Sequence, residues 1–208
     1  MRTALATLLV ALVASVVPAG AQLIDRILAV VASEPITLSD VMAAMQLGLV
    51  PEPAEPGDRQ QAVLNALIDR QLQLIEVNRY LPPEPPATEV DARLAQVRAR
   101  FPDQASFETV LQQTGVSHAQ LRARMRDTLR IEGYLQQRFG ASSQPGEDEL
   151  LRYYRAHEPD FTQSGVLQPY ATVRDEVRRR LVEERTDSFV RDWVAGLRRR
   201  ADVTVLPK

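Results

Sequence analysis

Near the start of the chain, β-branched and apolar residues form a short run, Ile27 to Val31, that is typical of a strand. Almost everything after it has the periodicity of amphipathic helices. A strand without a partner leaves backbone N–H and C=O groups unpaired, which costs free energy. The alternating segment 202–206 is the other clear strand pattern. We therefore expect the two ends of the chain to pair in a small sheet that packs against the helices between them.

Residues 1–21 have the organisation of a secretory signal peptide. Arg2 supplies the positive start, residues 4–17 are apolar, and Ala19-Gly-Ala21 is a small-residue cleavage pattern. The apolar run is too short to cross a membrane. We therefore expect cleavage after Ala21 and a periplasmic protein that comprises residues 22–208 in one domain. A retained anchor or a buried N-terminal helix is the alternative.

Composition excludes several classes of chemistry. The chain has no cysteine, which excludes disulfides, thiol catalysis and cysteine-ligated metals. Its formal net charge is −2, which argues against a general nucleic-acid binder. We interpret His118 as a solvated helix-start residue and His157 as a complement to a helix dipole. The carboxylates of 147–149 have the same dipole explanation, so we predict no catalytic residue, no metal and no cofactor.

Capping residues and apolar spacing predict that helices fill residues 37–160 and that a last helix precedes the final strand. Ser117 and Gln120 form a capping-box pattern, and Gly115 and Gly140 stand where two helices end. Proline-rich segments at 51–56 and 82–86 separate helices, either as hinges or as rigid spacers. We expect residues 161–169 to be a short irregular connection. The predicted helices are 41–49, 59–80, 88–101, 106–114, 117–139, 147–158 and 170–200.

Several segments, taken in order, resemble the SurA family of periplasmic chaperones. The opening IDRILAVVASEPITLSDV is similar to the strand and first helix with which that family begins. NALIDRQLQLIEVNR resembles its next helix, and EVDARLAQVRARFP, SFETVLQQTGVSHAQLRARMRDTLRIEGYLQQRF and DELLRYYRAHEPDF follow in the family's order. VRDEVRRRLVEERTDSFVRDWVAGLRRRADVTVL resembles the closing helix and strand. The resemblance covers nearly all of residues 22–208.

The resemblance implies a mainly α fold of the SurA N-terminal type, with a small β-sheet formed by the N-terminal and C-terminal strands. Family members insert parvulin-type isomerase domains before the closing helix, where this chain has only residues 161–169. We therefore expect a periplasmic, ATP-independent chaperone without the parvulin domain. Two alternatives stay open: a peptidyl-prolyl cis-trans isomerase, and a non-catalytic subunit that docks one envelope partner.

The resemblance also implies partners and a type of binding surface. The partners would be unfolded or nascent envelope polypeptides, including outer-membrane proteins, with transient proximity to the membrane surface and no nucleic acid. The oligomeric state is open. Such binding needs apolar surface that tolerates many sequences, which methionines and aromatics supply. The alternative is that each candidate is a core residue. The candidate client-binding residues are Met42, Met45, Leu49, Phe139, Tyr153, Tyr154 and Phe161.

Arg122, Arg126 and Arg130 lie four residues apart on one expected helix. One interpretation is contact with anionic lipid phosphates. We favour a solvated face that pairs with carboxylates such as Asp127.

Overall fold

The computed structural model describes residues 25–50 and 57–207, so the predicted signal peptide and the proline-rich segment 51–56 lie outside the described residues. The fold is mainly α with a small antiparallel sheet, as the sequence predicts. Its helices are α1 (Leu38–Gln46), α2 (Arg59–Tyr80), α3 (Ala87–Arg98), α4 (Gln104–Thr114), α5 (His118–Phe139), α6 (Glu147–Ala156), the 3-10 helix η1 (Glu158–Phe161) and α7 (Tyr170–Arg200). Its strands are β1 (Ile27–Val31), β2 (Glu34–Thr37), β3 (Thr162–Gln163), β4 (Val166–Leu167) and β5 (Val203–Val205).

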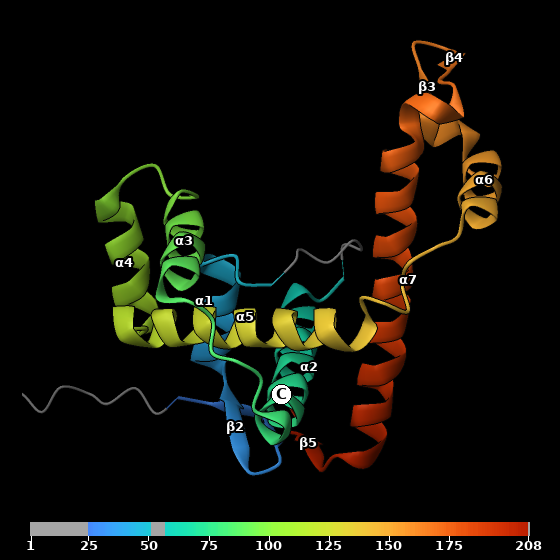
Figure 1. The fold of residues 1–208 in the computed structure, drawn as a ribbon. Coiled ribbons are helices and arrows are strands. Elements are labelled where there is room, and N and C mark those ends of the chain that lie inside the picture. The colour runs from blue at the N-terminus through green and yellow to red at the C-terminus, as the bar shows by residue number, and fades with distance from the viewer. Residues whose placement is uncertain (1–24, 51–56, 208) are drawn as a thin grey trace, which may run out of the picture.

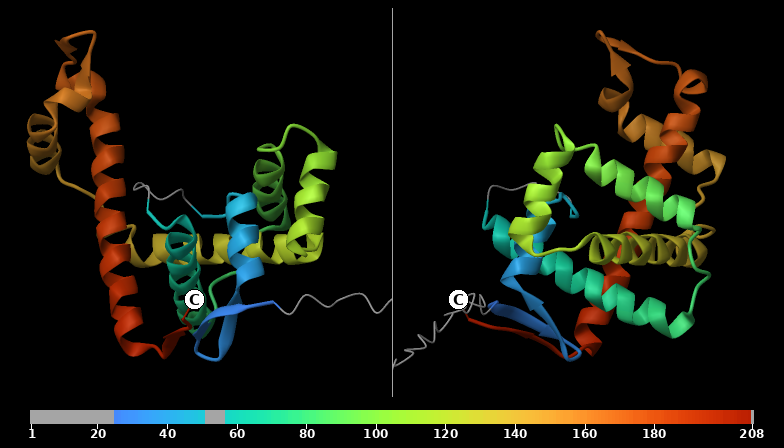
Figure 2. Two further views of the ribbon diagram at one scale, coloured as in Figure 1. Left: turned by 180° about the vertical axis from the view of Figure 1, so that it is seen from behind. Right: turned by 90° about the vertical axis from the view of Figure 1, so that its left-hand side faces the viewer.

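The molecule has a U-shaped outline (Figure 1). Helix α5 forms the base, and α3 with α4 rises from one end of it. At the other end, the long helix α7 carries α6, η1 and the hairpin β3–β4 away from the sheet, and the view from behind shows the same two arms (Figure 2). We call α6, η1, β3–β4 and the N-terminal half of α7 the distal arm.

The two ends of the chain meet in a sheet of order β2-β1-β5. Val30 pairs with Thr204 across the antiparallel ladder, which confirms that the first strand pairs with the last. Strand β2 was not predicted from the sequence. Pro35 is tolerated there because β2 is an edge strand. The turn before it uses positive φ angles at Ala32 (49°) and Ser33 (75°), residues that do not usually signal such a turn.

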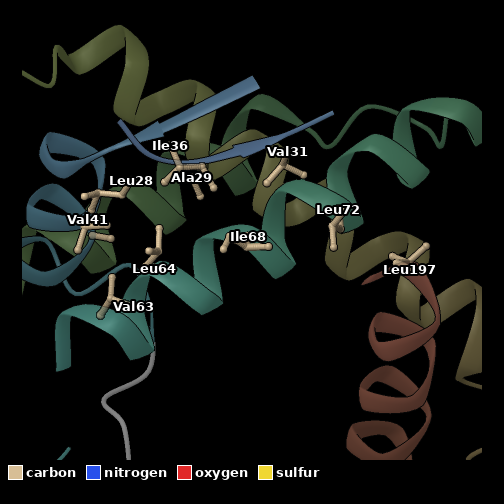
Figure 3. Close-up of a cluster of buried hydrophobic side chains, with 11 residues drawn as sticks. Leu28, Ala29, Val31, Ile36, Val41, Val63, Leu64, Ile68, Leu72 and Leu197 are labelled. Carbon is tan, nitrogen blue, oxygen red and sulfur yellow. The ribbon is translucent and has the colours of Figure 1, made fainter. Parts of the chain in front are cut away.

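One face of this sheet covers helix α2 (Figure 3). The helix places apolar residues such as Val63, Leu64 and Ile68 against Ala29 and Val31 of the first strand. Leu197 of α7 completes the cluster, so that residues far apart in the sequence share one core. The expected packing of the terminal sheet against the helices between the strands is therefore present.

A second core joins α1 to α3, α4 and α5, and it centres on Phe107, whose side chain is 0% exposed. Two helix starts in this region differ from the expected ones. Pro86, and not Thr88, precedes α3, and Asp103 caps α4 by accepting a hydrogen bond from the backbone N–H of Ser106. Helix α3 also ends before Phe101, at Arg98.

Helix α5 buries two different faces along its length. Leu121 and Met125 pack in the second core as expected, but Ile131 and Tyr134 pack against Val77 of α2. The buried side changes because α5 contacts α3, α2 and α7 along its length. A single apolar stripe could not anticipate this change. Leu129 and Leu135 are half-buried at the edges of these two clusters.

The distal arm has its own small core, formed by Leu150, Phe161, Val177 and Leu181. The connection expected to be irregular is the hairpin β3–β4, which turns at Ser164 and Gly165 with positive φ angles. Helix α7 begins and ends at the predicted residues and links this arm to the sheet. One helix thus takes part in two separate cores.

Candidate functional site

The five Phe, five Tyr and one Trp of the chain are not spread evenly. One group forms a stripe where α5 meets α7 and α2. Ring centroids lie 5.4 Å apart for Tyr80–Tyr134, 5.7 Å for Tyr134–Trp193, 6.1 Å for Phe139–Trp193 and 5.9 Å for Phe139–Phe189. We call these five residues the aromatic stripe. Tyr80 is exposed, Tyr134 is buried, and the other three are half-buried.

A cation borders the stripe. The guanidinium carbon of Arg138 lies 5.4 Å from the ring centroid of Phe139, 5.9 Å from that of Trp193 and 6.0 Å from that of Tyr134. Its Nη1 also donates to the hydroxyl oxygen of Tyr134 at 3.2 Å. Burial raises the pKa of the Tyr134 hydroxyl. The stripe therefore offers apolar ring surface beside a positive charge, a combination that suits aromatic and carbonyl-rich chains.

Local structure holds α5 and α7 in place around the stripe. Phe139 is the last residue of α5, and its carbonyl accepts a hydrogen bond from the hydroxyl of Ser143 at 2.9 Å. The Thr186 hydroxyl of α7 donates to Ser143 Oγ, also at 2.9 Å. Because Ser143 is fully buried, this link fixes the end of α5 against α7.

The second aromatic group is the interior of the distal arm. The Tyr154 ring lies 5.5 Å from Phe161 and 5.5 Å from Tyr170, and its hydroxyl donates to the Gln168 carbonyl at 2.5 Å. Phe161 is only 3% exposed. It is therefore a core residue of the arm, which corrects its prediction as a client-facing side chain. Tyr153 and Tyr154 are half-buried on the same small core.

The other predicted residues are Met42 and Met45 on α1 and Leu49 just after it, and none of them belongs to either aromatic group. Met42 is exposed, at 40% of its full area. Met45 and Leu49 are half-buried and pack against the sheet core. The structure therefore does not gather the seven predicted residues on one surface. Of the seven, Phe139 alone belongs to the aromatic stripe.

Tyr80, Phe189 and Trp193 of the aromatic stripe were not predicted as surface residues from the sequence. The missed signal is the spacing of Phe189 and Trp193, four residues apart on a helix whose neighbour ends in Phe139. Leu81 and Val166, which are 78% and 63% exposed, were also not predicted. Leu81 ends α2 and Val166 lies at the tip of the distal arm.

Carboxylates pair with the arginine series on α5, as we favoured, but the face is not wholly solvated because Arg130 is only 8% exposed. Arg126 and Arg130 both contact Asp127, at 3.0 and 3.7 Å, and both lie near Glu84 of the proline-rich linker. Arg122 pairs with Asp91 of α3. These contacts attach the 82–86 segment to α5.

Glu147 connects the start of α6 to α7. Its carboxylate accepts hydrogen bonds from Arg174 Nη2 at 2.6 Å and from the Tyr170 hydroxyl at 2.7 Å. These contacts lower the pKa of the Glu147 carboxyl to about 2, and the hydrogen bond from Arg174 makes the largest contribution. A depressed pKa stabilises the fold above the ordinary value of 4.5, and that contribution is lost as the pH falls from 4.5 towards 2.

We therefore expect Glu147→Gln to weaken the pH dependence of the distal arm. Between pH 6 and pH 3, the wild type should lose more thermal stability than the variant, because its unfolded state takes up a proton at this carboxyl while the folded state keeps it ionised. Melting followed by circular dichroism at both pH values measures the difference. Asp148→Asn, in the same helical turn, is the control and should behave as the wild type. Equal losses in the wild type and Glu147→Gln would contradict the assignment.

The described residues 25–50 and 57–207 contain no group of three or more His, Asp or Glu side chains that could hold a metal ion. His118 accompanies Glu108 at 2.9 Å and stacks near Phe107, as a helix-start residue would. Within the same ranges, no helix combines the length and the apolar character needed to cross a membrane.

No family model matches the sequence, and no curated protein matches it. Solved structures do match. One is a chain from the study of the virulence factor PEB4 and the periplasmic protein Cj1289, described as two structurally related SurA-like chaperones in the human pathogen Campylobacter jejuni. It is 16% identical, with a TM-score of 0.53, and the match covers 88% of this chain and all of that one. The fold is therefore similar to that of a SurA-like chaperone.

Proposed function

We propose that this chain is a periplasmic, ATP-independent chaperone that holds unfolded envelope proteins, including outer-membrane β-barrel precursors. The aromatic stripe is the observation that carries the proposal. Partly exposed rings on three different helices give a surface that can contact many sequences, since any apolar or aromatic side chain fits against a ring. The fold similarity to SurA-like chaperones supports the same function. The periplasmic location rests on the signal-peptide pattern in residues 1–21.

The surface suits weak and reversible binding. The rings of Tyr80, Phe139 and Phe189 are accessible in the folded chain, so no conformational change is needed before a client binds. Arg138 keeps the stripe partly hydrated and gives polar backbone groups a hydrogen-bond donor. Modest affinity spread over several rings allows release without an energy source.

An isomerase is the less favoured function. Where family members carry parvulin domains, the residues between η1 and α7 form only the two-residue strands of the β3–β4 hairpin. The catalytic module that the family uses would have no counterpart among the described residues. A prolyl-peptide isomerisation assay on the same protein distinguishes this alternative.

The experiment dilutes a urea-unfolded outer-membrane β-barrel protein into buffer with the mature chain, residues 22–208. We expect reduced light scattering and micromolar binding by the wild type. The double variant Phe139→Ala/Phe189→Ala should bind about ten-fold more weakly, because two partly exposed rings of the stripe are lost. Binding is measured by fluorescence anisotropy of the labelled client.

Val166→Ala is the matched control, because it removes an exposed apolar side chain at the distant tip of the arm. It should bind as the wild type does. Circular dichroism establishes that the double variant is folded, which we expect because both rings are only half-buried. Wild-type affinity in the double variant would rule out the stripe. If the chain bound one partner in a fixed ratio and bound no unfolded client, the result would favour a docking subunit.

A further inference from the structure

A cavity of about 250 Å³ lies between β2, the end of α1, α2 and α5. It is separate from the aromatic stripe and shares no residue with it. Its walls are partly apolar, with Leu49, Leu67, Leu74 and Met125 among the lining side chains. An apolar cavity of about 150 Å³ is large enough to bind benzene, so one large side chain fits here.

Arg70 is the unusual group in this lining. It is half-buried, and its Nη2 donates to the backbone carbonyl of Arg124 at 3.0 Å. Among residues 25–50 and 57–207, no carboxylate lies within ion-pair distance of its guanidinium. Burial lowers the pKa of Arg70, the opposite charge of Asp127 raises it, and the charge of Arg124 lowers it.

The carboxylates of the cavity are already engaged by other arginines. Asp40 accepts a hydrogen bond from Arg124 Nη2 at 2.5 Å. Asp127 pairs with Arg126 and Arg130 from the same helix. Within residues 25–50 and 57–207, Arg70 therefore has no carboxylate in direct contact with its half-buried charge, and the charge of Asp127 compensates it without an ion pair. Burying a charge without a direct partner costs free energy. A bound carboxylate would compensate it through charge-assisted hydrogen bonds, which are among the stronger ones.

The ligand that fits must bring a carboxylate and an apolar group on adjacent atoms. An Asp or Glu side chain brings a carboxylate but no apolar group beside it. The last residue of a polypeptide brings both, because its carboxylate and its side chain share one Cα.

We propose that this cavity binds the C-terminal end of a polypeptide client, with the terminal carboxylate on Arg70 and the last apolar side chain between Leu67 and Leu74. This inference rests on the proposed chaperone function and deepens it. The cavity would recognise chain ends, whereas the aromatic stripe would contact internal segments. A client with an apolar last residue would then engage two separate surfaces of the same molecule.

The test uses a fluorescein-labelled decapeptide of Gly, Ser and Gln that ends in Phe, made once with a free C-terminal carboxylate and once as the amide. We expect the wild type to bind the acid at least about ten-fold more tightly than the amide, as for the loss of a charged hydrogen-bond partner. Equal affinities would overturn the proposal, and this comparison does not depend on any variant folding.

Arg70→Gln should abolish the difference between acid and amide. Arg79→Gln is the matched control on the same helix, since Arg79 is exposed and pairs with Glu76 outside the cavity. It should keep the full difference. If Arg70→Gln retained it, the proposal would fail. Val50→Trp narrows the cavity and should also weaken binding of the acid peptide. This variant tests the cavity independently if Arg70→Gln does not fold.

Two further measurements identify the source of the carboxylate and separate this inference from the proposed function. Dodecanoate should displace the acid peptide only weakly, and displacement at lower concentration than the peptide itself would overturn a polypeptide ligand. Suppression of client aggregation is measured on the same preparation. Suppression without discrimination between acid and amide defeats the cavity proposal alone. Discrimination without suppression defeats the chaperone function and leaves the carboxylate site supported.

Discussion

Replacing Phe107 by alanine is expected to lower the free energy of unfolding of the main body, which comprises the sheet β2-β1-β5 and helices α1 to α5. The expected loss is about 3–5 kcal/mol, as for other buried Phe side chains. Phe107 is 0% exposed and is the largest fully buried side chain among the described residues. Its ring lies 5.4 Å from that of Phe101 in an edge-on arrangement, and the Arg98 guanidinium carbon lies 5.5 Å from its centroid. The substitution removes these contacts and leaves a cavity that the surrounding helices can fill only in part.

Urea unfolding followed by circular dichroism measures the effect as a lower midpoint with an unchanged slope. Val110→Ala is the control on the same helix, because Val110 is half-buried at the edge of the same core. It should cost about 1 kcal/mol or less, since it removes less buried surface. If Phe107→Ala cost no more than Val110→Ala, the second core would not hold α1, α3, α4 and α5 together.

The pairing of the two chain ends could be predicted from the sequence, because the backbone N–H and C=O groups of a strand need hydrogen-bond partners. Two strand patterns stood at the ends of a helical sequence, and each needed a partner. Strand β2 could not be predicted in this way. Its hairpin turn uses Ala32 and Ser33 with positive φ angles, and tertiary pairing with β1 outweighs their ordinary preferences. The β3–β4 hairpin was missed because its strands are two residues long, too short for a visible alternation.

Helices α2 and α7 begin and end at the predicted residues, because sharp signals surround them. Asp58 caps α2, and Pro169 immediately precedes α7. Helix α3 also follows a proline, Pro86, and begins one residue before its predicted start. Its end was placed less well, because Arg98 is the last helical residue and the apolar Phe101 lies beyond it.

The candidate site could be predicted only in part, because aromatic residues at helical spacing can be core or surface. Phe139 and Phe161 look alike in sequence, since each lies at or just beyond the end of an amphipathic helix. Phe139 meets α7 edge-on in the half-exposed stripe, whereas η1 turns Phe161 into the arm. The difference depends on how helices cross, which no local pattern contains. Similarly, Arg70 meets Arg124 across 54 residues, so the cavity has no signature in the sequence.

Replacing Phe161 by alanine is expected to unfold the distal arm while the main body stays folded. Phe161 is the aromatic centre of a core that has only three other buried residues, Leu150, Val177 and Leu181. A buried Phe to Ala change costs about 3–5 kcal/mol, and so small a core cannot supply much more than that. Arg180, whose guanidinium carbon lies 5.2 Å from the Phe161 centroid, would lose its contact as well.

Hydrogen exchange followed by mass spectrometry checks this expectation. Amides of α6 and of the β3–β4 hairpin should lose protection in Phe161→Ala, while those of α2 and α5 keep it. Tyr154→Phe is the control, since it removes the hydroxyl that donates to Gln168 but keeps the ring. It should loosen the hairpin only slightly, because one net hydrogen bond contributes about 1 kcal/mol.

The comparison with Phe107→Ala decides whether the molecule has one cooperative unit or two. Phe107 and Phe161 belong to different cores, and α7 is the helix that leads from the distal arm to the sheet. If each substitution exposes only its own region, the arm can unfold and refold on a folded body. If Phe161→Ala instead exposed α2 and α5 to exchange, α7 would couple the two cores, and the arm could not move independently of the aromatic stripe.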